Sequence, residues 1–241
     1  MAAAEISKSA VNRAGDIVRA QLAGETISGS EYERALLAIA GYRGAHAHAL
    51  QTVAAGLRYY VGKHSSREPT KVGQRLKRLP TIINKLAREP KMQLARMHDI
   101  AGCRAVVGDE DEVRAIAKHL TRRWEVIRQY DYMKRPKPVS GYRAYHLVVR
   151  KEGRWVEVQL RTFSQHAWAE LIESTDRRVP TIDLKSSRAP ADLLEYYRLG
   201  ARLLADREQG VPSDAEVLER FRDLHEQVTG YITENTPHYG S

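Results

Sequence analysis

The sequence predicts an α/β (α+β) protein with a mixed central sheet of about five strands, flanked by helices and extended by helices at both ends. Runs of strand length, apolar or alternating, occur in the middle of the chain, at 75–77, 100–107, 124–128, 146–150 and 155–162. Amphipathic stretches with helical spacing lie between and around them. We expect one domain, 1–241, made of N-terminal helices 5–61, a core 70–175 and C-terminal helices 189–232.

The composition is that of a globular protein, with 42% hydrophobic and 29% charged residues in a chain of 241. No apolar run approaches the roughly 18 residues of a membrane span, and the first residues lack the apolar core of a signal peptide. Cys103 is the only cysteine, which excludes a disulfide within the chain and a cysteine metal cluster. We therefore expect a cytoplasmic protein without a membrane partner.

The net charge of +9 favours anionic partners such as nucleotides, phosphates or RNA. Basic residues dominate from Arg58 to Arg104, where only Glu68, Glu89 and Asp99 are acidic.

The sequence of the N-terminal part predicts two helices. Apolar residues recur with helical spacing over 5–22, and Gly24 ends that helix. Ser30 and Glu33 have the spacing of a capping box, which predicts a second helix from there to about Val61.

A basic segment follows a polar loop at 63–71. Pro80 suits the first turn of a helix, so 75–77 is expected to be extended and 81–88 helical. Arg75 and Lys77 then share one face of the extended piece. Thr81, Lys85 and Arg88 share one face of the helix, at i, i+4 and i+7. Four cations that converge in this way suit a polyphosphate, although a solvated basic face has the same pattern.

Further polar residues accompany the central strands. Asp99 lies at the start of an apolar strand, and a helix over 109–122 and a short strand over 124–128 follow. Residues 131–145 contain two prolines and Gly141 and are expected to form a loop. Tyr142 is expected to be exposed there among bases, either as a stacking platform for a nucleobase or packed on the domain.

A hairpin with a tight turn at 152–153 leads into the strand 155–162. Its strict alternation puts Glu157, Gln159 and Arg161 on one face and the apolar residues on the other. An acid, an amide and a cation on a rigid element suit a functional site. Alternation alone favours a solvent-facing strand whose polar side has no function.

The C-terminal part is expected to be helical. A helix over 163–174 would bury Trp168, Leu171 and Ile172, and an irregular segment follows it. Two amphipathic helices over about 191–208 and 213–232 complete the chain.

Four motifs in this order resemble the synthetase domain of the RelA/SpoT family. They are Arg75-x-Lys77 with Thr81 and Lys85, then HDIAGCR at 98–104, KPVSGYRAYH at 137–146 and EVQLRT at 157–162. The resemblance covers roughly 40–175 and implies a nucleotidyltransferase-like fold of the short, single-domain type. We expect neither a hydrolase domain nor a regulatory C-terminal region.

The resemblance implies transfer of the β,γ-pyrophosphate of ATP to a ribose 3′-hydroxyl. Asp99 and Glu157 would be catalytic and would hold Mg²⁺. The ATP-binding residues would be Arg75, Lys77, Thr81, Lys85 and Arg104. The acceptor-binding residues would be Lys137, Ser140, Gly141, Tyr142, Arg143, His146 and Gln159.

Three departures from the family pattern concern mainly the acceptor. Thr81 replaces a Ser, Ser140 replaces the frequent Asn before the Gly, and no Glu-His follows the Trp168-Ala169 pair. With the basic surplus, they favour the tRNA 3′ end as acceptor, as in a toxin that inhibits translation and is paired with an antitoxin. An alarmone synthetase that uses GDP or GTP is the alternative. A catalytically inactive RNA-binding module is a third hypothesis, and an oligomer is compatible with each.

Overall fold

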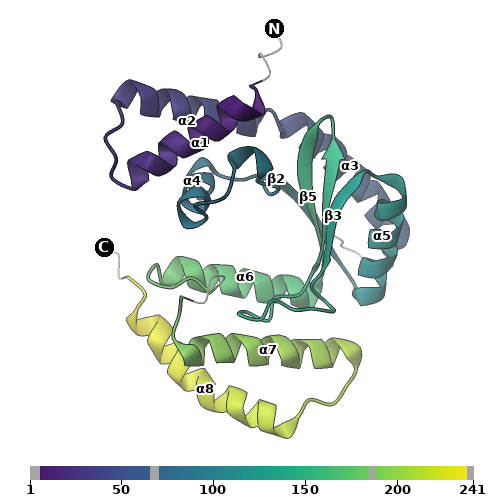
Figure 1. The fold of residues 1–241 in the computed structure, drawn as a ribbon. Helices are drawn as coiled ribbons and strands as arrows, with labels where there is room; N and C mark the ends of the chain where they lie inside the picture. The colour runs from purple at the N-terminus through teal and green to yellow at the C-terminus, as the bar shows by residue number, and fades with distance from the viewer. Residues whose placement is uncertain (1–5, 66–70, 185–187, 238–241) are drawn as a thin grey trace.

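The computed structural model describes residues 6–65, 71–184 and 188–237, so Pro69 in the predicted loop at 63–71 lies outside the described residues. A five-stranded sheet with strand order β1-β2-β5-β4-β3 forms its centre (Figure 1). The pairing of β2 with β5 is parallel and the other three pairings are antiparallel. This confirms the predicted mixed sheet of five strands. The strands are β1 Lys71–Leu76, β2 Ala101–Val107, β3 Val126–Asp131, β4 Tyr145–Lys151 and β5 Arg154–Thr162.

The predicted hairpin joins β4 and β5. Glu152 and Gly153 both have positive φ values, 51° and 71°. That is the requirement of a two-residue type I′ turn, which matches the twist of the flanking strands. The turn sets the register in which His146 lies opposite Gln159 and Val148 opposite Glu157.

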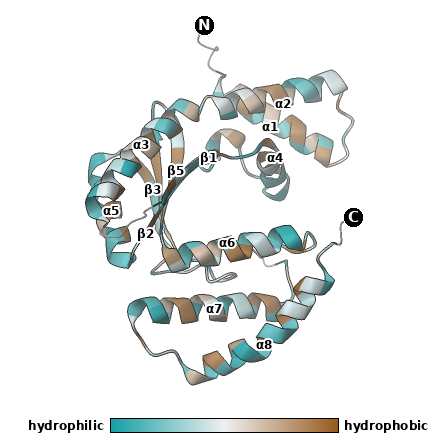
Figure 2. Ribbon diagram, turned by 180° about the vertical axis from the view of Figure 1, so that it is seen from behind, coloured by the Kyte–Doolittle hydropathy of each residue, from teal (hydrophilic) through white to brown (hydrophobic). Residues whose placement is uncertain are grey.

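Two helices cover one face of the sheet, α3 Ala47–His64 and α5 Glu110–Arg123 (Figure 1). Val156, Val158 and Leu160 of β5 point into this core and are fully buried. Figure 2 shows the contrast between the hydrophobic central strand and the largely hydrophilic outer helix α5. The other face of the sheet is therefore the one that carries polar side chains.

An N-terminal helical group lies beyond one end of that polar face. It contains α1 Lys8–Leu22, α2 Gly29–Gly44 and α4 Leu79–Arg88, packed around a core of their own. The prediction of one helix from Ser30 to Val61 was wrong, because the chain breaks at Ala45 and His46 between α2 and α3. The prediction that Ser30 caps this helix was also wrong, since the hydroxyl of Ser28 accepts a hydrogen bond from the Glu31 N–H.

A C-terminal helical group extends from the same side of the sheet (Figure 1). It contains α6 Phe163–Arg178, α7 Ala191–Gln209 and α8 Ala215–Glu234. Trp168 and Ile172 are buried as expected, whereas Leu171 is 45% exposed, so its assignment to the core was wrong. No described helix is both long and apolar enough to span a membrane.

Candidate active site

The polar face of β5 is largely enclosed. Arg161 is only 4% exposed, and the side chain of Glu157 is 20% exposed. Gln159 connects the two: its Nε2 donates to Glu157 Oε2 at 2.7 Å and its Oε1 accepts from Arg161 Nη2 at 2.7 Å. This excludes the alternative of a strand whose polar side only faces solvent.

Tyr142, in the loop before β4, and His146, on β4, close these contacts into a ring. Arg161 Nη2 also donates to the Tyr142 hydroxyl at 2.8 Å. The hydroxyl lies 2.7 Å from His146 Nε2, and His146 Nδ1 lies 3.1 Å from Glu157 Oε1. The ring runs from Arg161 through Tyr142 and His146 to Glu157, and back through Gln159.

The donors and acceptors of this ring have a single direction when the imidazole is neutral. A guanidinium can only donate, so Tyr142 is left with its own proton to give to His146 Nε2. His146 must then carry its proton on Nδ1 and donate it to the Glu157 carboxylate. In this protonation state, two paths of hydrogen bonds start at Arg161, one through Gln159 and one through Tyr142 and His146, and both end at Glu157.

This environment sets the protonation of the two acids in the ring. Burial favours the neutral form of Glu157, but the hydrogen bonds and charge from His146 and the hydrogen bond from Gln159 outweigh it and lower its pKa. Burial raises the pKa of Tyr142 to about 12, against the opposing effect of Arg161. Glu157 is therefore a carboxylate and Tyr142 a neutral phenol at neutral pH.

Asp99 receives two cations. Lys77 Nζ lies 2.8 Å from Asp99 Oδ2, and Lys85 Nζ lies 3.1 Å from Asp99 Oδ1. Burial alone would raise the pKa of Asp99, but the two ammonium groups lower it. Pro80 in the first turn of α4 makes this possible, because β1 ends just before the helix starts and both elements then face Asp99.

The remaining cations of the basic segment lie apart. Arg75 is exposed on β1 opposite Gly102, and Thr81 is exposed on α4. Arg88 does not join the predicted convergence, since its Nη1 pairs with Asp183 Oδ2 at 2.5 Å. Lys85 and Arg88 lie on a helix as predicted. Arg88, one turn after Lys85, nevertheless points away from Asp99.

The loop between β3 and β4 is held from behind by the C-terminal group. Ser140 is buried, and its carbonyl accepts from Trp168 Nε1 at 3.3 Å. Tyr142 is half-buried, so the expectation of an exposed aromatic was wrong. Lys137 Nζ lies 5.5 Å from the centre of its ring, and Arg143 turns away to pair with Glu110 at 2.5 Å.

Comparison with known proteins places this face in a family. Residues 74–176 match the model of the region found in RelA / SpoT proteins. These residues therefore form a RelA/SpoT region. All four sequence motifs lie within that segment.

Curated relatives align with part of this chain. The GTP pyrophosphokinase YjbM of Bacillus subtilis is 33% identical over 112 residues, which cover 42% of this chain and 53% of that protein. An uncharacterized protein of Mycobacterium tuberculosis is 34% identical over 117 residues, 46% of this chain and 41% of its own length. This chain thus aligns with about half or less of these relatives.

Two small alarmone synthetases of Bacillus subtilis share the fold. Synthetase 1, solved with its product pppGpp, aligns with a TM-score of 0.55 at 23% identity over 76% of this chain and 94% of its own. Synthetase 2 aligns with a TM-score of 0.59 at 22% identity over 71% and 96% of the two chains.

The carboxylates of the RelA/SpoT region fit a hard cation. Asp99 precedes β2 and Glu157 lies on the neighbouring parallel strand, where the charge of Asp99 opposes the lowering of the Glu157 pKa. No group of three or more ligating side chains occurs among the described residues. Mg²⁺ needs none, because it keeps several waters and binds through one or two carboxylates together with substrate phosphates.

Two aromatic residues of the RelA/SpoT region were missed by sequence reasoning, Tyr132 and Trp155. Tyr132 meets both Tyr142 and His146 edge to face, with ring centres 6.0 and 5.1 Å apart. Trp155 meets His98 edge to face at 4.6 Å, beside Asp99. The alternation of β5 places Trp155 on the face of Glu157 and could have indicated it.

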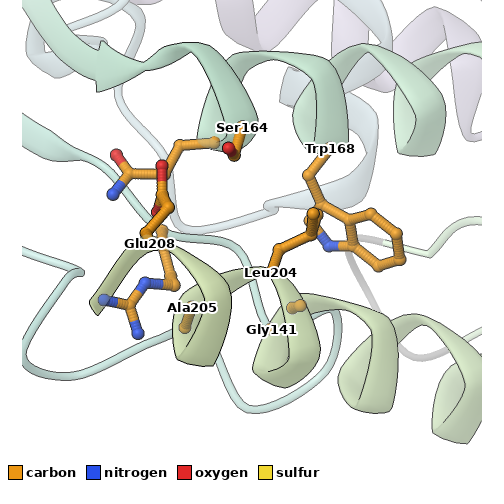
Figure 3. A pocket seen from close by; sticks show the side chains of 9 residues that line it. Gly141, Ser164, Trp168, Leu204, Ala205 and Glu208 are labelled. Atoms are coloured by element: carbon orange, nitrogen blue, oxygen red, sulfur yellow. The ribbon is translucent and has the colours of Figure 1, made fainter. Parts of the chain in front are cut away.

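A small cavity lies between the loop that precedes β4 and the helices α6 and α7 (Figure 3). Its volume is about 10 Å³, which is room for about one water. Gly141, Trp168, Leu204 and Glu208 are among the residues that line it.

Proposed function

We propose that this chain is a pyrophosphokinase that transfers the β,γ-pyrophosphate of ATP to the 3′-hydroxyl of a guanosine nucleotide. The observation that carries the proposal is the pair of carboxylates, Asp99 and Glu157, between a lysine pair and a hydrogen-bonded ring. The name of the relative YjbM, a GTP pyrophosphokinase, supports the guanosine acceptor.

In this reaction the 3′-oxygen attacks the β-phosphorus of ATP. A bond forms between these two atoms, the bond from the β-phosphorus to the α,β-bridging oxygen breaks, and AMP leaves. Lys77 and Lys85 would release Asp99 and bind the phosphates of ATP. Arg75 and Arg104 lie on the face of the sheet that carries Glu157 and would add further contacts to ATP. Mg²⁺ on the two carboxylates would neutralise charge that develops on the phosphate oxygens.

Glu157 would orient the acceptor hydroxyl and accept its proton, since the ring holds it as a carboxylate. The acceptor base would lie near Tyr142, with Lys137, Ser140 and Gly141 shaping the loop around it. His146 and Gln159 would act by holding Glu157. Arg143 would shape the far end of the loop through Glu110.

The tRNA 3′ end is the second candidate acceptor, in a toxin that would have an antitoxin partner. The net charge of +9 favours it, because a polynucleotide presents many phosphates to a basic surface. A guanosine nucleotide needs far fewer cations than this surplus offers.

Labelled transfer tests the proposal. The protein is incubated with γ-³²P-ATP and Mg²⁺ and either GTP or deacylated tRNA, and the labelled product is identified. Label on guanosine nucleotide supports the first acceptor and label on tRNA alone supports the second. Absence of label from both would refute pyrophosphate transfer and favour the third hypothesis, a catalytically inactive RNA-binding module.

A matched pair of variants tests the role of Glu157. We expect Glu157→Gln to lower the transfer rate at least about hundredfold, the size of a lost general base. Glu152→Gln, at the exposed hairpin turn, makes the same change of charge and should keep the wild-type rate. Full activity of Glu157→Gln would refute both its metal-binding and its proton-accepting role.

A further inference from the structure

A second cleft lies where the tip of the β4–β5 hairpin meets the start of α1. Its volume is about 460 Å³, within the 300–1,000 Å³ range of small-molecule sites. Three cations line it, Lys8 from α1 and Arg150 and Arg154 from the two sides of the hairpin turn. Tyr42 and Trp155 add aromatic walls.

The described side chains that line this cleft include three cations and no carboxylate. Arg150 pairs with Glu125 at 3.0 Å, but both side chains are about half exposed, so this ion pair is weak and can yield to a ligand. The guanidinium of Arg154 lies 5.3 Å from the ring centre of Tyr42, which fixes its position at the wall.

The start of α1 adds to this positive potential. Ser7 caps the helix through the Ala10 N–H and lines the cleft, and the first turn contains no acidic residue. The positive end of the helix dipole is therefore not neutralised by its own side chains. It acts together with three cations from two distant parts of the sequence.

We propose that this cleft binds a nucleoside phosphate, with phosphate oxygens on Lys8 and Arg150 and the base against Trp155. Arginine and lysine provide forked and single contacts to phosphate, and an indole ring is a strong platform for any base. A free nucleotide and a phosphodiester-linked nucleotide of an RNA share this chemistry.

The cleft is connected to the candidate active site through Trp155. This residue lies two positions before Glu157 on the same face of β5. Its ring touches His98, whose neighbour in the chain is Asp99. A ligand that stacks on Trp155 therefore contacts a residue that lies next to both Glu157 and the His98–Asp99 pair.

Equilibrium dialysis with radiolabelled GTP and Mg²⁺ tests the proposal. The test variant is Lys8→Ala/Arg150→Ala, in which both changed side chains are exposed. The matched control is Lys118→Ala/Arg122→Ala, which removes two exposed cations from α5. We expect the test variant to bind one GTP per chain fewer than wild type, or to bind that GTP at least tenfold more weakly, and the control to match wild type.

A second arm identifies an RNA source of the same ligand. An RNA oligonucleotide with the sequence of a tRNA 3′ end is titrated at several salt concentrations. Affinity that falls at least tenfold only in the test variant, with a salt slope smaller by about 1.4 for two lost phosphate contacts, assigns the cleft to RNA. Unchanged binding of both GTP and RNA would overturn the proposal.

These outcomes are separate from those of pyrophosphate transfer. Transfer without any effect of the test variant on binding would refute the cleft and keep the proposed function. Binding in the cleft by a protein that transfers no label would support the cleft and refute the proposed function. Equal thermal unfolding of the test and control variants checks that both are folded.

Discussion

Arg161 closes the ring of side chains around Glu157. Its Nη2 bonds to two acceptors, while its Nε and Nη1 are buried without a partner among the described residues. A buried guanidinium is costly unless its charge is compensated. The compensation comes indirectly, since Gln159 and Tyr142 pass its hydrogen bonds on to the Glu157 carboxylate. Arg161 is thus a positioning residue.

The pH dependence of transfer tests this ring at His146. The hydrogen bond and charge of His146 help to lower the Glu157 pKa. His146→Leu removes them, so the pKa of Glu157 should rise. Because the carboxylate form is the active one, the acid limb of kcat/KM should move to higher pH, as measured by transfer assays between pH 4 and pH 8.

His146→Asn is the matched control. An Asn amide can replace the Nδ1 donor to Glu157 without the imidazole charge. We expect its acid limb to lie between those of wild type and His146→Leu. Identical limbs in all three proteins would show that His146 does not control the protonation of Glu157.

Asp99 should contribute to stability in a pH-dependent way. Its pKa is lowered in the folded state, so its contribution is present above the usual value of 3.8 and is lost as the pH falls through the lowered value. We expect Asp99→Asn to cost about 1–3 kcal/mol at pH 7 in metal-free buffer, because two ammonium groups lose their partner. Urea unfolding should show this difference shrinking below pH 3.8.

Asp223→Asn on the exposed surface of α8 makes the same change without a lysine pair. Its unfolding free energy should follow that of wild type across this pH range. A loss in Asp99→Asn that persists undiminished at pH 2 would contradict the ion-pair explanation.

At the scale of residues, the sequence predicted which side chains share a face. Alternation correctly grouped Glu157, Gln159 and Arg161. It could not predict that Tyr142 and His146 would join them, because that depends on the register between β4 and β5. The prediction that Tyr142 is exposed was wrong for a related reason, since the partners that bury this loop aromatic are distant in the sequence.

At the scale of elements, α7 holds the loop that carries Tyr142. Gly141 has a φ of 63°, and a Cβ atom there would lie 2.4 Å from the Cβ of Ala201 on α7. We expect Gly141→Ala to lower stability by about 1–2 kcal/mol from backbone strain and further from the contact with α7. It should also raise the KM for the acceptor more than the KM for ATP.

Gly153→Ala separates the two effects. Gly153 has a similar φ of 71° at the hairpin turn, with open space where a Cβ atom would lie. Its variant therefore suffers the backbone strain alone. A second change, Ala201→Gly, should restore part of the stability and acceptor KM of Gly141→Ala. Equal losses in Gly141→Ala and Gly153→Ala would show that α7 does not press on the loop.

The errors at this scale have local causes. Ser28 and Ser30 are both good capping residues two positions apart, and only the path of the chain into α2 selects Ser28. The break at Ala45 and His46 lacks a proline, and its cause is the different packing of α2 and α3. α2 packs in the N-terminal group, whereas α3 packs on the sheet.

At the scale of the whole molecule, two helical groups extend from one side of the sheet (Figure 1). The ion pair between Arg88 on α4 and Asp183, which follows α6, connects them. Arg88 also lies one turn after Lys85, so the sequence suggested a phosphate ligand. The structure instead gives Arg88 the role of linking the two groups.

Variants of these neighbouring cations separate the two roles. We expect Arg88→Gln to leave the KM for ATP within about twofold of wild type, because the lost ion pair is partly exposed and worth at most about 1 kcal/mol. Lys85→Gln should raise that KM at least tenfold, since Lys85 lies at Asp99. Steady-state kinetics with varied ATP measures both.

A double-mutant cycle of Arg88→Gln with Asp183→Asn then measures the link itself. Arg88 is 45% exposed and Asp183 is 14% exposed, so solvent screens the pair and the coupling energy should be about 0.5–1 kcal/mol. Hydrogen exchange should become faster in 179–184 and at the end of α4 in either single variant, and no faster in the double variant. A coupling energy of zero, together with a raised KM for ATP in Arg88→Gln, would return Arg88 to the phosphate site that its spacing predicted.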